Sequence, residues 1–216
     1  MNMKIEIWSD YVCPFCYIGK RRLEQALENL SLNTEIEIDY KSFELDPEAP
    51  MNTGLTIEEK LAHKYGKSIE EAKEMPKNMS QQAIEAGLNF QLNHMIPTNT
   101  FKAHMVAKLA EKRGLKNELT EKLFQSVFTS GKDIGDTKTL LEIAGEVGLE
   151  ADEVLEVLTN NTYGETVRQE EAEAYEIGVQ GVPFYVINRK YAISGAQPPE
   201  VFVKSLKKVI EGEHSS

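Results

Sequence analysis

The sequence predicts an α/β fold that is interrupted by an all-helical insertion. Strand, helix and strand patterns follow one another in about the first 45 residues, helical patterns alone extend from Pro47 to about Asn161, and strand patterns return near the C-terminal end. At 216 residues the chain is long enough for one large domain or for a small domain with a substantial insertion. We therefore expect a discontinuous domain at residues 1–48 and 162–216 and a helical insertion domain at residues 49–161.

Two segments near the N-terminal end have the alternation of a β-strand. Polar and apolar residues alternate from Lys4 to Trp8 and again from Thr34 to Lys41, with isoleucine at several of the apolar positions. This alternation is typical of a strand with one buried face. We therefore expect two half-buried strands.

The segment between these strands has the period of an amphipathic helix that begins at Pro14. Proline is favourable at the first helical position, because its missing N–H would have no partner within the helix. Cys16 lies seven residues before the first of three leucines that share one helix face: Leu23, Leu27 and Leu30. We expect Cys16 on the buried face and Cys13 at the first turn.

Signals for several helices follow one another in the predicted insertion. The segments Thr56–Glu59 and Ser68–Glu71 have the form of capping boxes, in which a hydroxyl and a carboxylate bind free amides at a helix start. A helical pattern from Phe101 to Arg113 ends at Gly114. Later helices are indicated by apolar residues at helical spacing and by a terminal glycine: Leu119, Leu123, Val127, Phe128 and Gly148.

The C-terminal part returns to an α/β pattern. A helix over residues 162–176 is followed by a strand from Val182 to Asn188, a two-residue turn and a strand from Tyr191 to Ser194, which together predict a hairpin. An amphipathic helix begins at Pro198-Pro199. Pro183 lies near the start of the first of these strands, and because proline removes a ladder amide, it indicates a strand edge or special backbone geometry.

The two cysteines belong to a Cys13-Pro14-Phe15-Cys16 motif at the start of a helix that follows a strand. Free amides and the dipole of the first helical turn stabilise an anion, so we expect Cys13 to be the attacking thiolate. Cys16, one turn further along and facing inward, can then resolve a mixed disulfide. The motif predicts thiol–disulfide exchange that needs no metal and no organic cofactor.

Three other roles for the cysteine pair stay open: a zinc half-site, a structural disulfide and incidental thiols. Four-coordinate zinc needs two more ligands, and the histidines form no pair at the usual short spacing: His63, His94, His104 and His214. A structural disulfide between Cys13 and Cys16 would close too short a loop to restrict the unfolded chain much.

Charge and hydropathy exclude several classes of protein. The formal net charge of −11 is unfavourable for nucleic-acid binding, which requires clustered lysine and arginine, and no apolar run approaches the roughly 18 residues of a membrane span. The first ten residues lack the apolar stretch of a secretory signal, so we expect a cytoplasmic protein. Most of the excess negative charge lies between Glu142 and Glu176, where we expect a solvated helical face.

Five segments, in order along nearly the whole chain, match the pattern of one family: Ser9–Gly19, Phe43–Pro47, Asn99–His104, Gly178–Phe184 and Ser194–Gln197. They resemble the DsbA-like oxidoreductases of the thioredoxin fold, and among these the cytoplasmic FrnE-like branch. The resemblance implies a thioredoxin-like sheet that is split by the helical insertion.

The resemblance also implies roles for residues far from the motif. It implies that the Val182–Pro183 bond is cis and that this loop lies beside Cys13, where its backbone binds an extended substrate segment. It places Asn99 and His104, both on the insertion, toward the active site. Without the resemblance, the alternatives are an ordinary trans proline at a strand entrance and a core or surface histidine on a helix.

The chain departs from DsbA at Phe15. DsbA has histidine at this position, whose charge and hydrogen bonds favour the thiolate and make the cysteine pair strongly oxidising. Phe15 offers neither, so we expect a more reducing couple than that of DsbA. In the kappa-class glutathione transferases and hydroxychromene-carboxylate isomerases, which share the fold, the pattern has serine where Cys13 stands and lacks the second thiol.

The sequence therefore predicts a cytoplasmic thiol–disulfide oxidoreductase that acts on protein or low-molecular-weight disulfides. Cys13 attacks, Cys16 resolves and Pro183 shapes the substrate groove. The expected partners are thiol or disulfide proteins or a glutathione-like small thiol, and neither nucleic acid nor a membrane. A glutathione-dependent transferase or isomerase and a non-catalytic binding module are the alternatives.

Overall fold

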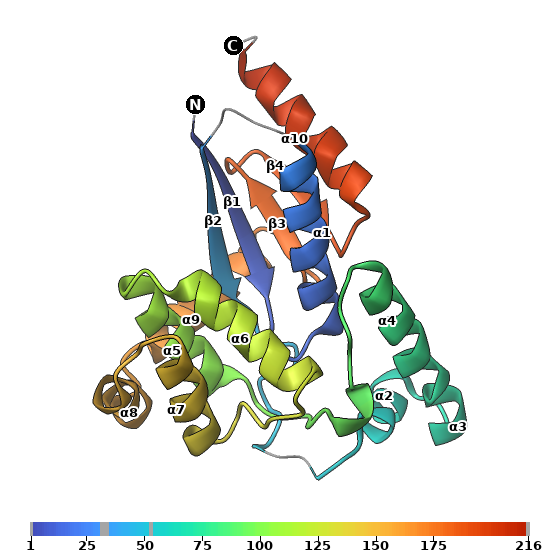
Figure 1. Cartoon of the computed structure of the whole chain (residues 1–216), viewed down its shortest axis with the longest axis vertical. Coiled ribbons are helices and arrows are strands. Elements are labelled where there is room, and N and C mark those ends of the chain that lie inside the picture. Colours follow the sequence, from blue (N-terminus) through green and yellow to red (C-terminus); the bar gives the residue numbers. More distant parts are fainter. Residues whose placement is uncertain (1, 31–34, 52–53, 215–216) are drawn as a thin grey trace.

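A computed structural model of the chain describes residues 2–30, 35–51 and 54–214. Within these ranges, a four-stranded sheet has the order β2-β1-β3-β4 (Figure 1), with strands β1 (Asn2–Ser9), β2 (Glu35–Ser42), β3 (Phe184–Ile187) and β4 (Tyr191–Ser194). Strands β1 and β2 are parallel, and β3 is antiparallel to both β1 and β4. Thr34, which the sequence places in the second strand, lies outside the described residues.

The helices follow the order that the sequence predicts. Helix α1 (Pro14–Leu30) connects β1 to β2, and α10 (Pro199–His214) follows β4. Between β2 and β3 the chain forms a series of helices and one short 3₁₀ turn: α2 (Ile57–Tyr65), α3 (Ile69–Ala72), α4 (Glu74–Glu85), η1 (Leu92–His94), α5 (Phe101–Lys112), α6 (Lys116–Phe128), α7 (Thr137–Glu146), α8 (Ala151–Asn160) and α9 (Gly164–Glu176). Both predicted capping boxes, at the starts of α2 and α3, are confirmed.

Helices α1 and α10 pack against each other and cover one face of the sheet (Figure 1). The alternation in β1 and β2 directs their isoleucines to this face, as the sequence predicts. The resulting apolar cluster joins strands and helices: Ile5, Ile7, Leu23, Ala26, Tyr185, Ile187, Phe202 and Leu206. It fixes the second half of α1 on the sheet.

The opposite face of the sheet is also covered, chiefly by α9. Trp8 is completely buried there, and its indole Nε1 donates a hydrogen bond of 2.9 Å to the backbone oxygen of Glu170. Ala174 of α9 and Val186 of β3 belong to the same small apolar cluster. The prediction of half-buried strands is therefore wrong for the second halves of β1 and β2, where residues on both faces are largely buried.

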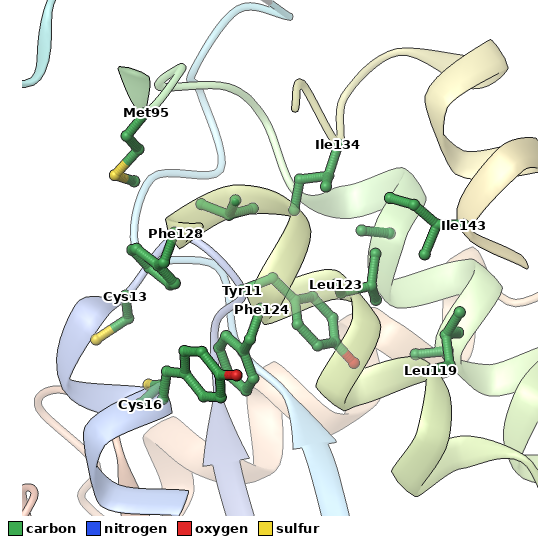
Figure 2. Packing of buried hydrophobic residues seen from close by; sticks show 14 of the residues in the cluster. Tyr11, Cys13, Cys16, Met95, Leu119, Leu123, Phe124, Phe128, Ile134 and Ile143 are labelled. Carbon is green, nitrogen blue, oxygen red and sulfur yellow. The ribbon is translucent and has the colours of Figure 1, made fainter. Parts of the chain in front are cut away.

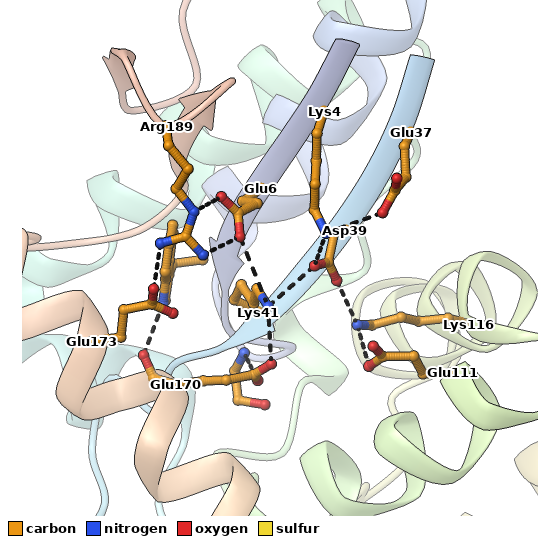
Figure 3. Close-up of polar contacts among 12 residues, drawn as sticks. Lys4, Glu6, Glu37, Asp39, Lys41, Glu111, Lys116, Glu170, Glu173 and Arg189 are labelled. Atoms are coloured by element: carbon orange, nitrogen blue, oxygen red, sulfur yellow. Dashed lines mark hydrogen bonds and ion pairs between the residues drawn. The ribbon is translucent and has the colours of Figure 1, made fainter. Parts of the chain in front are cut away.

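The charged residues on this second face form ion pairs with one another (Figure 3). The carboxylate of Asp39 lies 3.1 Å from Nζ of Lys116 and 3.1 Å from Nζ of Lys41. Burial alone would raise the pKa of Asp39, but these two ammonium groups hold it well below its usual range. Glu6, which is 2% exposed, pairs with Arg189 of the β3–β4 turn.

Helices α5 and α9 contribute a second pair to the same network. Lys108 is 5% exposed, and its Nζ donates to the carboxylates of Glu170 and Glu111. Burial opposes the charge of Lys108, but Glu170 and Glu111 raise its pKa above the ordinary value. Glu170 and Glu171 are themselves buried, so the prediction of a fully solvated acidic face between Glu142 and Glu176 is wrong at these two positions.

We expect removal of one partner from this network to destabilise the fold strongly. Lys108→Met leaves Glu170 buried next to an apolar side chain, and its free energy of unfolding in urea should fall by about 3 kcal/mol. Lys77→Met on α4 removes an ion pair in which both side chains are more than 70% exposed, and should change it by less than about 0.5 kcal/mol. Equal losses in the two variants would contradict a structural role for the buried network.

Candidate active site at the start of helix α1

The Cys-Pro-Phe-Cys motif is placed by the end of β1. The backbone N–H of Cys13 donates to the carbonyl of Asp10 at 3.1 Å, and the N–H of Cys16 donates to the carbonyl of Cys13 at 3.0 Å. Helix α1 begins at Pro14, as the sequence predicts. Cys13 therefore precedes the first helical residue, at the positive end of the helix dipole.

Both cysteines are free thiols and both are buried, Cys13 with 4% and Cys16 with 2% of its surface exposed. Figure 2 shows them at one margin of a large apolar cluster that includes Phe124 and Phe128 of α6. Phe15 is half-buried and packs against the same cluster. The sequence predicts the burial of Cys16 but not that of Cys13.

The surroundings of Cys16 favour its protonated form. Burial, followed by the neighbouring Cys13, raises the pKa of the Cys16 thiol well above its ordinary value. The Ser9 hydroxyl and the Asp10 backbone act in the opposite direction but are weaker. The Cys16 thiol is therefore held in its protonated form by its surroundings.

The loop before β3 lies beside Cys13. The Val182–Pro183 peptide bond is cis, and the Cys13 Sγ donates to the carbonyl of Val182 at 3.6 Å. The carbonyl of Pro183 accepts a hydrogen bond of 2.8 Å from the N–H of Gly195, which follows β4. The hairpin thus holds the Val182 carbonyl next to the thiol.

Gly19 permits this close approach of α1 to the proline loop. A Cβ atom at position 19 would clash with the hydroxyl of Tyr185 and would lie 3.1 Å from Cγ of Pro183 and 3.4 Å from Cβ of Ala196. Tyr185 cannot easily move away, because it is 1% exposed and packs edge-on against Phe202. The sequence pattern gives no individual role to Gly19, since its contacts come from residues more than 160 positions away.

His104 lies behind the loop that carries Cys13. Its Nε2 is 3.5 Å from Oδ1 of Asp10, and its ring is 4.9 Å from that of Tyr11. Oδ2 of Asp10 accepts a hydrogen bond of 2.8 Å from the N–H of Leu45, which connects the loop to the end of β2. His104 is only 2% exposed, and it contacts the loop that precedes the motif rather than solvent.

Asn99, the other predicted binding residue of the insertion, is occupied by protein contacts. Its side-chain amide donates to the carboxylate of Glu44 and to the carbonyl of Pro47, both at 3.2 Å, and its Oδ1 accepts from the N–H of Phe101 at 3.0 Å. Glu44 is completely buried and also accepts from Arg168 of α9 at 2.6 Å. Asn99 thus links the start of α5 to the loop after β2, apart from the cysteines and Pro183.

Within residues 2–30, 35–51 and 54–214, no three His, Cys, Asp or Glu side chains converge in a group that could hold a metal ion. In the same ranges no helix combines the length and the apolar character that are needed to cross a bilayer.

Comparison with known proteins shows which family and which solved structures the chain is similar to. A family model described as the DSBA-like thioredoxin domain matches residues 4–207. The crystal structure of a probable DsbA oxidoreductase, SCO1869 from Streptomyces coelicolor, is 38% identical in sequence and superposes with a TM-score of 0.90 over 95% of this chain and 89% of that chain.

Two more distant structures share the fold. A 2-hydroxychromene-2-carboxylate isomerase is 13% identical, with a TM-score of 0.68 over 98% of both chains. The cytosolic disulfide reductase DsbM from Pseudomonas aeruginosa, solved with GSH, is 15% identical, with a TM-score of 0.67 over 96% of this chain and 99% of that chain. At such identities the likeness concerns the fold alone.

We expect Gly19→Ala to separate α1 from the proline loop and to lower the free energy of unfolding by about 1 to 3 kcal/mol, the usual effect of overpacking. Gly145→Ala is the matched control, because Gly145 also lies in a helix but a Cβ atom there would meet nothing within 4 Å. That control should be neutral or more stable by up to about 1 kcal/mol. Urea denaturation of both variants decides, and equal stability would contradict the steric role of Gly19.

Proposed function

Because this chain belongs to the family of DSBA-like thioredoxin domains, we propose that it is a thiol–disulfide oxidoreductase that works through Cys13 and Cys16. Its fold is the thioredoxin-like α/β fold with an all-helical insertion. The single observation that supports the proposal best is the placement of Cys13, which precedes the first residue of α1 and faces the carbonyl of Val182 at 3.6 Å.

In the reductive direction the Cys13 thiolate attacks one sulfur of a substrate disulfide. A bond forms between Cys13 and that sulfur, and the other substrate sulfur leaves as a thiolate. The Cys16 thiol then loses its proton and attacks the Sγ of Cys13, which forms the Cys13–Cys16 disulfide and releases the second substrate thiolate. The substrate gains two electrons and the cysteine pair loses two. Substrate oxidation is the reverse sequence.

The proline loop is suited to the mixed-disulfide stage. Val182 is half-buried, and its carbonyl is held next to the Cys13 sulfur. A backbone N–H of an extended substrate segment can donate to this carbonyl. The hydrogen bond would place the segment beside the reacting sulfur. We propose that Val182 and Pro183 align the substrate and that Pro14 and Phe15 support the motif.

We also propose that the protein belongs to the FrnE-like branch and acts in the cytoplasm on protein disulfides or on low-molecular-weight disulfides. The motif residues and the absence of histidine between the cysteines support this proposal. A glutathione-dependent transferase or isomerase is the second candidate, since a 2-hydroxychromene-2-carboxylate isomerase shares the fold. The retained Cys16, enclosed behind Cys13, favours the redox function.

Cys16→Ser should trap the enzyme as a mixed disulfide. Without the resolving thiol, Cys13 stays bonded to the substrate sulfur. When the reduced variant is mixed with glutathione disulfide, mass spectrometry should show one glutathione bound to each protein molecule. Insulin reduction by this variant should fall by at least about 100-fold. Cys13→Ser is the control and should form no adduct. Full turnover by Cys16→Ser would favour the transferase or isomerase function, and activity of the double serine variant would favour a non-catalytic binding module.

The Cys13–Cys16 couple should be more reducing than that of DsbA, whose potential is about −120 mV. Phe15 supplies neither a charge nor a hydrogen bond to the Cys13 thiolate, so the reduced form is stabilised less. Equilibration with a series of glutathione buffers measures the potential, and Phe15→His should shift it toward that of DsbA. A wild-type potential as high as that of DsbA would contradict this expectation.

A further inference from the structure

A small polar cavity lies between the ends of β1 and β2 and the helices α5 and α6. It has room for about one water molecule, with a volume of about 10 Å³. Ser9 and Tyr11 from the end of β1, and His104, Ala107 and Lys108 from α5, form part of its lining. Its polar lining makes this space suitable for a water molecule rather than for an apolar group.

Three fully enclosed polar atoms at this place form no hydrogen bond with any described residue: Oγ of Ser9, Nε2 of His104 and Oδ1 of Asp10. Buried polar groups without partners are rare, because each costs about 1 to 3 kcal/mol. Ser9 and His104 line the same water-sized cavity, and Asp10 lies 3.5 Å from Nε2 of His104. One water molecule in the cavity would satisfy the first two of these atoms.

Ser9, the last residue of β1, lines the cavity and also influences the resolving thiol. Its hydroxyl acts on Cys16 in the direction that stabilises a thiolate. Ser9 is 5% and Cys16 2% exposed, so solvent has little direct access to the Cys16 proton. In the proposed reaction this proton must nevertheless leave before Cys16 can attack.

We propose that Ser9, a water molecule in this cavity and His104 form an internal path that accepts the proton of Cys16 when the mixed disulfide on Cys13 is resolved. This inference rests on the proposed redox function. The Cys16 proton passes to Oγ of Ser9 while the Ser9 hydroxyl proton passes to the water and a water proton to Nε2 of His104. The resulting imidazolium lies against the Asp10 carboxylate, and the Cys16 thiolate attacks Sγ of Cys13.

Other charged or titratable groups face this path from every surrounding element, and they set its electrostatic environment. They are Cys13 at the start of α1, Tyr11, Asp10, Tyr40, Lys41, Glu44, Lys108, Lys116 and Tyr185. The lysines are paired with Asp39, Glu111 and Glu170, so they supply no net charge to the cavity. Asp10, at 3.5 Å from Nε2, and the buried Glu44 are therefore the carboxylates that stabilise a positive charge on His104.

The test uses the reduced full-length protein and the aromatic disulfide 5,5′-dithiobis(2-nitrobenzoate) in a stopped-flow spectrometer. Attack by Cys13 releases one coloured thiolate, and attack by Cys16 on the mixed disulfide releases a second one. The two reactions are therefore seen as two phases, and only the second requires the Cys16 proton to leave.

We expect the rate of the first phase in His104→Gln to stay within about twofold of the wild-type rate. The second phase at pH 7 should be slower by about 100-fold, which is the lower range for the loss of a general base. The second phase of this variant should also rise about tenfold per pH unit, since hydroxide must then remove the proton, whereas the wild-type profile should be flatter. Ser9→Ala should change the second phase in the same way by a smaller factor, and it also tests the path if His104→Gln does not fold.

Matched controls separate this role from a structural one. Ser126→Ala removes another buried hydroxyl, on α6, and His63→Gln removes an exposed imidazole, on α2, so both should keep the wild-type second phase. Circular dichroism establishes that each variant is folded. A second phase with wild-type rate and pH profile in folded His104→Gln or Ser9→Ala would overturn the proposed path. A wild-type protein without any second phase would instead refute the proposed redox function.

Discussion

The pairing of buried charges on one face of β1 and β2 is the constraint on which the rest of this structure depends. A buried charge without a partner costs several kcal/mol, so Asp39 and Glu170 can be enclosed only if lysines reach them. Those lysines are Lys41 on β2, Lys108 on α5 and Lys116 on α6. The ion pairs of the two helix lysines therefore help to fix how α5 and α6 lie on the sheet. Because His104 precedes Lys108 by one helical turn, the same ion pair holds the imidazole behind Asp10 and the cysteine motif.

The active site depends on a second, purely steric constraint. Helix α1 must approach the proline loop closely enough for Cys13 to contact the carbonyl of Val182. Tyr185 and Pro183 occupy the space next to the helix, and this leaves room for glycine alone at position 19. The ion-pair network fixes the helices behind the loop that precedes the motif. The contact at Gly19 fixes the proline loop, on the side where the substrate is proposed to bind. The two thiols thus occupy one helical turn that is held from both directions.

Local patterns made most of the fold predictable from the sequence. Alternation in β1, leucine spacing in α1 and the capping residues of α2 and α3 act within a few residues, so the sequence shows them directly. The burial of the charged strand face was not predictable, because a charged residue next to water and one beside a distant lysine give the same local pattern. Lys108 on the otherwise apolar surface of α5 was the available signal: a charge at a buried helical position requires a partner.

The burial of Cys16 is the reason why the proposed chemistry requires an internal proton acceptor. Burial keeps the proton on Cys16 and so prevents the resolving thiol from reacting before Cys13 has bonded to a substrate. However, burial also separates this proton from the solvent at the moment when it must leave. A buried thiol can keep its proton before the first attack and lose it afterwards only if a polar group buried beside it accepts the proton. That group must also be stabilised when it becomes charged. Asp10 and His104 meet this condition. The Leu45 amide holds Asp10 through Oδ2, and helix α5 carries His104, so that Oδ1 of Asp10 and Nε2 of His104 face each other without other partners among the described residues.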